Sequence, residues 1–503
     1  MAPAVYPIQP AQLLKSERRA SSAQYAMTRL RFKVPLQHDH IGPNDDYVEL
    51  TAHMLYDDAR SSNGTRPSED WVTHMKNDNN GMHDLPIILY LCGGPGADNP
   101  PNRNPAMNQW LLEHGYSILY MDYRGCGESS TIYADALLHD LPRKEDQEIA
   151  KYLTHFCQDN IVRDLEAVRH CLSRERVIAG GFQIKWTILG QSYGGYISLT
   201  YLSTFPEGLQ EVFITGGLPP CGMKIDEYFR IEYQDIVKQN KKFYATYPDS
   251  KDLVRNILTL INTIGPRNIK MTGRGYMNGQ KLLTLGRQFG SKVGFPEVYN
   301  LLQRINYDLQ HTSKLSMETI VQFESTLHVD ERPLYPIFLE QTWCSGGKTR
   351  WAAERVACEI EGFEYLRQKD DGTYPDPAKT PSSTPIYFTA NTYCRFHYDT
   401  HEELIDLKGA AEILADHEWE CPYNYEMLAN NPYKVPVYAV IFEKDMHLDV
   451  GVAATTAAMV GGLRLVVDPG WHQDIRYKPG EVLERLFIEK RAAEKEMEIE
   501  MKG

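Results

Sequence analysis

The sequence predicts an α/β protein built on a mostly parallel, doubly wound sheet. Short apolar runs such as "PIILYL" and "WTILG" have the length of strands that are buried on both faces. Several of these runs end at glycines, and segments with apolar residues at helical spacing, such as "NIVRDLEAVRHCL", lie between them. Buried strands that alternate with helices are typical of a parallel sheet with helices on both faces.

Six strands are expected before residue 220. The first two alternate apolar and polar residues, as half-buried strands do, and the other four are continuously apolar. In chain order the six are "MTRLRFKVPLQHD", "YVELTAHMLYDD", "LPIILYLCGGPG", "YSILYMDYRGCGES", "WTILG" and "EVFITGGLPP". A helix is expected over "GYISLTYLSTF", directly after the fifth strand.

The character of the chain changes after Pro220. Residues 221–383 are polar, rich in Tyr and mostly helical in pattern, and they end in the loop-forming stretch "DDGTYPDPAKTPSSTP". Strand-like runs then return at "TPIYFTA", "VPVYAVIFEKD" and "GLRLVVDPGW", before a charged terminal helix. We therefore predict one sheet domain, residues 1–220 and 384–503, with a mainly helical cap, residues 221–383, inserted after the sixth strand.

Composition excludes several classes of function. The 503 residues carry a formal net charge of -14 with no block of basic residues, so nucleic acid or an anionic membrane is not expected as a partner. No apolar run is long enough for a membrane span or a signal peptide, so a cytoplasmic protein is expected. The nine cysteines form no CxxC pair, and no metal or other cofactor is predicted.

A glycine-rich turn around Ser192 is the strongest functional signal. "GQSYGG" follows a strand and precedes a helix, which is the context that the G-x-S-x-G pattern of serine hydrolases requires. In such a turn the serine has a strained backbone and an exposed hydroxyl, and the flanking glycines remove Cβ atoms that would collide. The helix start also offers unpaired N–H groups. Ser192 is therefore predicted to be a nucleophile.

A serine nucleophile needs a base and a carboxylate that orients the base. In this class of fold the carboxylate follows a late strand and the histidine follows the last one. His472 comes just after the last strand-like run, and Asp445 comes at the end of the preceding one. Asp449, four residues later, competes with Asp445 for the same role.

The negative charge that develops on the attacked carbonyl oxygen needs two N–H donors. The first is expected to be the backbone N–H of Tyr193, the residue after the nucleophile. The second is expected from the loop "CGGPG", with Gly94 as the choice.

Four motifs together resemble one family. "GGPG", "MDYRGCGES", "GQSYGG" and "DPGWHQD" occur in the order found in the prolyl aminopeptidase (proline iminopeptidase) family of α/β-hydrolases, and the resemblance is closest to its fungal branch. It extends over about residues 27 to 485. It implies an α/β-hydrolase fold with a helical cap, and Ser192, Asp445 and His472 as the triad, which favours Asp445 over Asp449.

The resemblance also implies how a substrate would be bound. Members of the family remove an N-terminal residue, typically proline, and hold its ammonium with glutamates from the cap side. Glu340 in "IFLEQTW" matches one such position, whereas Asn391 stands where fungal relatives carry the glutamate of Thr-Gly-Glu-Met. Two smaller departures are Cys92 before GGPG and Tyr123 in "MDYRG".

Three functions follow from these residues. The first is a cofactor-independent aminopeptidase that cleaves proline or a small apolar residue from a small peptide through an acyl-enzyme. The second keeps the machinery for a less cationic acyl substrate, as an esterase, amidase, thioesterase or acyl-transferring cyclase, and the neutral Asn391 favours it. The third is a scaffold without catalysis. Both a monomer and a homo-oligomer are compatible with the sequence.

Overall fold

The computed structural model describes residues 8–19, 25–39, 46–57, 70–73, 86–140, 145–178 and 182–502. Its centre is a sheet of nine strands in the order β1-β2-β3-β5-β4-β6-β7-β8-β9. The strands are β1 (Gln12–Arg19), β2 (Ala26–Pro35), β3 (Tyr47–Tyr56), β4 (Ile87–Leu91), β5 (Ser117–Met121), β6 (Trp186–Gln191), β7 (Leu209–Thr215), β8 (Val437–Phe442) and β9 (Leu463–Asp468).

The sheet is antiparallel at one edge and parallel elsewhere. The pairs β1–β2, β2–β3 and β3–β5 are antiparallel, and every later pair is parallel. The alternating pattern of β2 and the continuously buried β4, β5, β6 and β8 match these two environments. The predicted α/β-hydrolase fold is confirmed, although β1 was not predicted, so that the sixth predicted strand is β7.

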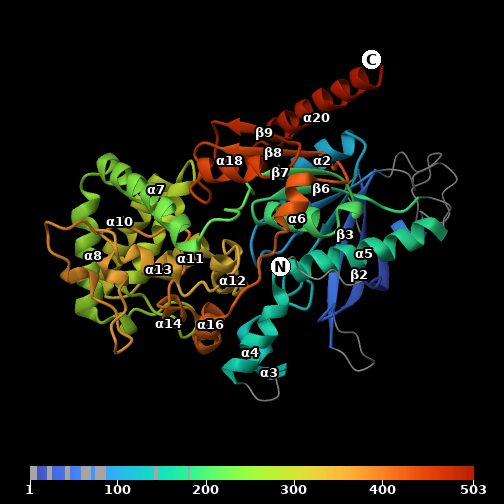
Figure 1. Cartoon of the computed structure of the whole chain (residues 1–503). Coiled ribbons are helices and arrows are strands. Elements are labelled where there is room, and N and C mark those ends of the chain that lie inside the picture. The colour runs from blue at the N-terminus through green and yellow to red at the C-terminus, as the bar shows by residue number, and fades with distance from the viewer. Residues whose placement is uncertain are drawn as a thin grey trace.

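Helices cover both faces of the sheet (Figure 1). Helix α5 packs on α6, and α2 packs on α20, so the two pairs form separate layers. The helices of this part of the chain are α2 (Pro105–Glu113), α3 (Ala134–Asp140), α4 (Asp146–Leu153), α5 (Gln158–Ile178), α6 (Tyr193–Thr204), α18 (Val450–Ala458), α19 (Asp474–Tyr477) and α20 (Pro479–Lys502). No helix among the described residues is long and apolar enough to span a membrane.

A helical segment separates β7 from β8 and lies beside the sheet in Figure 1. Its helices are α7 (Ile225–Thr246), α8 (Ser250–Ile264), α9 (Gly279–Leu282), α10 (Gly294–Thr312), α11 (Met317–Leu327), α12 (Leu334–Thr342), α13 (Ala352–Ala357), α14 (His397–Thr400), α15 (Glu402–Ile405), α16 (Lys408–Ala415) and α17 (Tyr425–Asn430). We call residues 221–436 the helical segment. The predicted cap boundaries, residues 221–383, remain a prediction.

The strand expected over residues 384–390 is not formed. Phe388 exchanges two hydrogen bonds with the side chain of Asn240, and the N–H of Thr389 donates to Leu283 O over 3.0 Å. The backbone of this buried, strand-like run is therefore satisfied by helical neighbours rather than by the sheet. Its apolar residues cover helices of the segment, which is why the pattern misled the prediction.

Candidate active site

Ser192 occupies a strained turn between β6 and α6. Its backbone has φ 55° and ψ -121°, a region that residues other than glycine rarely adopt. The conformation is held by hydrogen bonds from Ser192 N–H to Thr215 O (2.9 Å) and from Gly195 N–H to Ser192 O (2.7 Å). A Cβ atom on Gly194 would lie 2.0 Å from Leu91 O, so this glycine is required where the turn presses on β4.

His472 and Asp445 form a buried pair beside this turn. Asp445 follows β8 and His472 follows β9, as the sequence predicts. His472 Nδ1 lies 2.6 Å from Asp445 Oδ2, and Asp445 Oδ1 accepts the N–H of His447 over 2.7 Å. Asp449 instead caps α18 by accepting the N–H of Val452 over 2.9 Å. Of the two competing acids, Asp445 is the one that contacts the imidazole.

The loop after β4 lies directly against Ser192. A Cβ atom on Gly93 would come within 3.2 Å of Ser192 Cβ, and one on Gly94 within 3.6 Å of the Tyr193 ring. The Tyr123 hydroxyl donates to Cys92 O over 3.0 Å, which fixes the start of this loop. Burial raises the pKa of Cys92 to about 12, so its thiol stays neutral.

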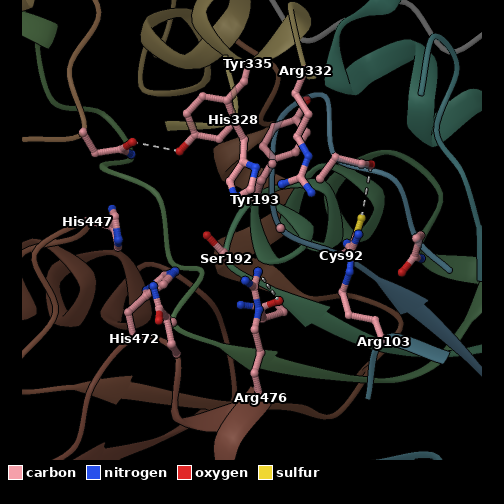
Figure 2. A pocket seen from close by; sticks show the side chains of 18 of the residues that line it. Cys92, Arg103, Ser192, Tyr193, His328, Arg332, Tyr335, His447, His472 and Arg476 are labelled. Atoms are coloured by element: carbon pink, nitrogen blue, oxygen red, sulfur yellow. Dashed lines mark hydrogen bonds between the residues drawn. The ribbon is translucent and has the colours of Figure 1, made fainter. Parts of the chain in front are cut away.

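One cavity of about 360 Å³ contains these groups, a volume within the range of small-molecule sites. Ser192, His472, Gly94 and Tyr193 all line it, together with residues of the helical segment. Its polar lining includes Tyr90, Asn99, Arg103, Asn104, Tyr196, Arg287, Gln288, His328, Arg332, Tyr335, Asn391, His447, Gln473 and Arg476. Figure 2 shows Ser192 facing this space, with His472 on one side and three arginines around it.

The two predicted substrate-binding residues differ in position. Asn391 lines the cavity and accepts a hydrogen bond from the Tyr335 hydroxyl over 2.9 Å. Glu340 does not line it but lies in a separate small cavity, where Oε1 accepts the N–H of Ala353 over 2.9 Å. Burial raises the pKa of Glu340 to about 7. Its position argues against the expectation that Glu340 holds a substrate ammonium.

The helical period explains where Glu340 points. Tyr335 and Leu339, four residues apart on α12, both line the cavity that contains Ser192. Glu340 is one residue further and is rotated by about 100° around the helix axis. The match to the family therefore identified the right helix, α12. The spacing of Tyr335 and Leu339 shows which face of that helix lines the cavity, and Glu340 lies on another face.

Other site residues were not predicted. Arg103, Arg287, Arg332 and Arg476 line the cavity, but they are far apart in the sequence and share no motif. Glu232 on α7 is a further surprise: it is 5% exposed, and neither carboxyl oxygen has a hydrogen-bond partner among the described residues. In the described part of the chain, no group of three or more His, Cys, Asp or Glu side chains could hold a metal ion.

Several known proteins are similar to this chain in sequence. Residues 86–245 match a family model described as the alpha/beta hydrolase fold. The chain is 31% identical to a proline iminopeptidase of Aeromonas sobria over 407 residues, 80% of this chain and 87% of that protein. It is 30% identical to the proline iminopeptidase aneH of Aspergillus aculeatus over 496 residues, 95% of this chain and 97% of that one.

Among solved structures, a proline iminopeptidase of Mycobacterium smegmatis is 15% identical, with a TM-score of 0.38 over 89% of this chain and 97% of that one. The matches to the Aeromonas and Aspergillus proteins cover both the sheet and the helical segment. This chain therefore belongs to the proline iminopeptidase family of α/β-hydrolases.

Proposed function

We propose that the protein is a serine hydrolase of the prolyl aminopeptidase type, with Ser192 as nucleophile, His472 as base and Asp445 as the group that orients the base. The buried 2.6 Å contact between His472 Nδ1 and Asp445 carries this proposal. It fixes the imidazole so that Nε2 is left for the serine proton, and it stabilises the imidazolium that forms during reaction.

The reaction follows from these roles. Ser192 Oγ transfers its proton to His472 Nε2 and forms a bond to the substrate carbonyl carbon. The negative carbonyl oxygen is held by the N–H groups of Tyr193 and Gly94. The C–N bond then breaks, and His472 returns the proton to the leaving amine. Water, deprotonated by the same histidine, attacks the acyl-enzyme and frees Ser192.

The substrate class comes from the family. Relatives that match most of this chain are named proline iminopeptidases, so an N-terminal proline or small apolar residue of a small peptide is the proposed acyl group. Asn391 and the hydroxyl of Tyr335 can offer neutral hydrogen-bond partners to the amine, since both line the cavity.

The test combines labelling with hydrolysis. Wild-type protein should be labelled by a fluorophosphonate probe and should release β-naphthylamine from proline β-naphthylamide. Ser192→Ala should abolish both, whereas the same substitution at the exposed Ser383 should change neither. Labelling that persists in Ser192→Ala would contradict the assignment of the nucleophile.

A second candidate is an esterase, amidase, thioesterase or acyl-transferring cyclase that uses the same triad. One observation favours it: no Asp or Glu is among the described residues that line the cavity, so a free ammonium would have no anionic partner there. N-Acetylation of proline β-naphthylamide distinguishes the two, because it should abolish cleavage by an aminopeptidase but not by an amidase of neutral substrates.

A further inference from the structure

Among the described residues that line the catalytic cavity, the charged side chains other than histidine are all arginines. Arg103 and Arg476 come from the sheet domain, and Arg287 and Arg332 come from the helical segment. Figure 2 shows Arg103, Arg332 and Arg476 directed towards the space around Ser192. This local excess contrasts with the net charge of -14 of the whole chain. A cavity of one sign in a protein of the other concentrates ligands of opposite charge.

Two of these arginines share one carboxylate. Asp98 Oδ1 lies 2.7 Å from an Arg103 nitrogen and 3.4 Å from an Arg332 nitrogen. Arg287 and Arg476 have no ion-pair partner among the residues that the structure describes, although carboxylates elsewhere in this structure pair widely with arginines. The cavity therefore holds at least two guanidinium groups whose charge is uncompensated.

Arg476 lies next to the reacting serine. Its Nη2 donates to Gln191 Oε1 over 3.3 Å, and a Cβ atom on Gly93 would lie 3.6 Å from the same nitrogen and 3.2 Å from Ser192 Cβ. Arg476 is on the short helix α19, four residues after His472, so both side chains come from the segment that follows β9.

Arg287 lines the cavity from the helical segment and is held in place by hydrogen bonds. Its Nη1 donates to Leu327 O over 2.7 Å and to the Tyr393 hydroxyl over 3.0 Å. The guanidinium carbon is 4.8 Å from the centre of the Tyr335 ring, which is a stacking distance. Both hydrogen bonds are donated by Nη1, so Nη2 and Nε of Arg287 are available to an acceptor in the cavity.

These contacts favour an anion over a cation. The half-buried Arg287 guanidinium is costly without an anion, and the exposed Arg476 adds a second positive charge to the same cavity. A carboxylate bound there would offset the positive charge of the arginines, and its two oxygens match the planar donor fork of a guanidinium. The carboxyl of Glu232 on α7 does not line the cavity and cannot supply this charge from within the protein.

We propose that the catalytic cavity binds substrates that carry a carboxylate, and that Arg476 and Arg287 hold it. This inference rests on the proposed hydrolysis at Ser192 and names the substrate class of the same site. The carboxylate has two sources: the free C-terminus of a short peptide, on the leaving-group side, or a carboxyl group on the acyl part of a less peptide-like substrate.

Two pairs of substrates separate these sources. Prolyl-alanine and prolyl-alaninamide differ only in the carboxylate of the leaving group. p-Nitrophenyl hemiglutarate and p-nitrophenyl valerate differ in a carboxylate on the acyl chain. In at least one pair, wild-type protein should prefer the carboxylate in kcat/KM by at least tenfold. Arg476→Gln and Arg287→Gln should each lower that preference at least fivefold, mainly through KM for the carboxylate member.

The same substitution at Arg491 is the matched control, because this arginine lies on α20 and pairs with Glu484 outside the cavity. It should leave both preferences unchanged. Raising the ionic strength should weaken the preference, as expected for a charge interaction in contact with solvent. When both pairs are turned over, the proposal is overturned if neither pair shows the preference, or if the preference survives both cavity substitutions in proteins that retain the wild-type circular dichroism spectrum.

A binding measurement separates this proposal from the proposed hydrolysis. Calorimetric titration of Ser192→Ala with glutarate should show binding that glutaramide lacks, and adding Arg476→Gln should weaken it at least tenfold. Glutarate binding without turnover of either substrate pair would support the anion site and refute the hydrolysis. Turnover of proline substrates with equal binding of glutarate and glutaramide would refute the anion site alone.

Discussion

Replacing Glu232 by glutamine should change how the stability of the protein depends on pH. Glu232 lies on α7, is 5% exposed, and has no hydrogen-bond partner for either carboxyl oxygen among the described residues. Burial of the carboxyl, opposed by the neighbouring Tyr228 and reinforced by the charge of Asp445, raises the pKa of Glu232 to about 8. A neutral amide of nearly the same shape fits this environment at every pH.

The sign follows from proton binding. The unfolded chain releases this proton near the ordinary value of 4.5, whereas the folded protein keeps it to about pH 8. Between these values the folded state binds more protons, so its stability falls as the pH rises. The slope approaches about 1.4 kcal/mol per pH unit only between the two pKa values, so the wild type should lose about 3.5 kcal/mol relative to Glu232→Gln between about pH 5 and pH 8.

Urea unfolding of both proteins at pH 5, 6, 7 and 8 measures this difference. The glutamine variant should be close to wild type at pH 5 and should gain a growing advantage towards pH 8. Glu361→Gln, the same substitution at an exposed position, is the control and should show no such trend. A difference between wild type and Glu232→Gln that stays constant with pH would refute the reasoning, because it would mean that Glu232 is charged in the folded protein.

Other predictions test the site directly. Asp445→Ala should lower kcat/KM by about 10³-fold or more, whereas Asp449→Ala should leave it nearly unchanged and cost about 1 kcal/mol of stability through the lost cap of α18. Gly194→Ala places a Cβ 2.0 Å from Leu91 O and should destabilise the protein by about 3 kcal/mol in urea unfolding. Glu340→Gln should alter hydrolysis of proline β-naphthylamide less than threefold, whereas Asn391→Glu should raise it at least tenfold; a large loss with Glu340→Gln would restore that residue to the amine site.

The sequence predicts the α/β-hydrolase sheet well because its signals are local. Buried strands are continuous apolar runs, and the turn at Ser192 needs glycines wherever a Cβ would strike a neighbouring strand. The order of strands along the chain also places Asp445 and His472 at the same edge of the sheet. Strand β1 was missed because it is a polar edge strand, mostly exposed or half-buried, without an apolar pattern.

The cavity wall is harder to predict because it depends on packing between distant segments. Arg103 and Arg476 are separated by more than half of the chain, and neither belongs to a motif. Residues 384–390 have a strand-like composition, but Asn240 and Leu283 take their backbone hydrogen bonds. Glu340 matches a family position in sequence, yet it lies on another face of α12 than Tyr335 and Leu339 and lines a separate cavity.

Position 391 connects the loss of an anion with the charge of the cavity. Asn391 accepts the hydroxyl hydrogen of Tyr335, and the ring of the same tyrosine stacks against Arg287. A glutamate at this position, as in the fungal relatives that the sequence resembles, would place a carboxylate in the same cavity as Arg287 and offset part of its charge. The asparagine therefore has two effects at once: it removes an anion that could hold an ammonium, and it leaves an arginine available to a substrate carboxylate. Asn391→Glu should reverse both, so the gain on proline β-naphthylamide should be accompanied by a smaller preference for carboxylate substrates. A gain on the first without a loss on the second would show that the two charges act independently.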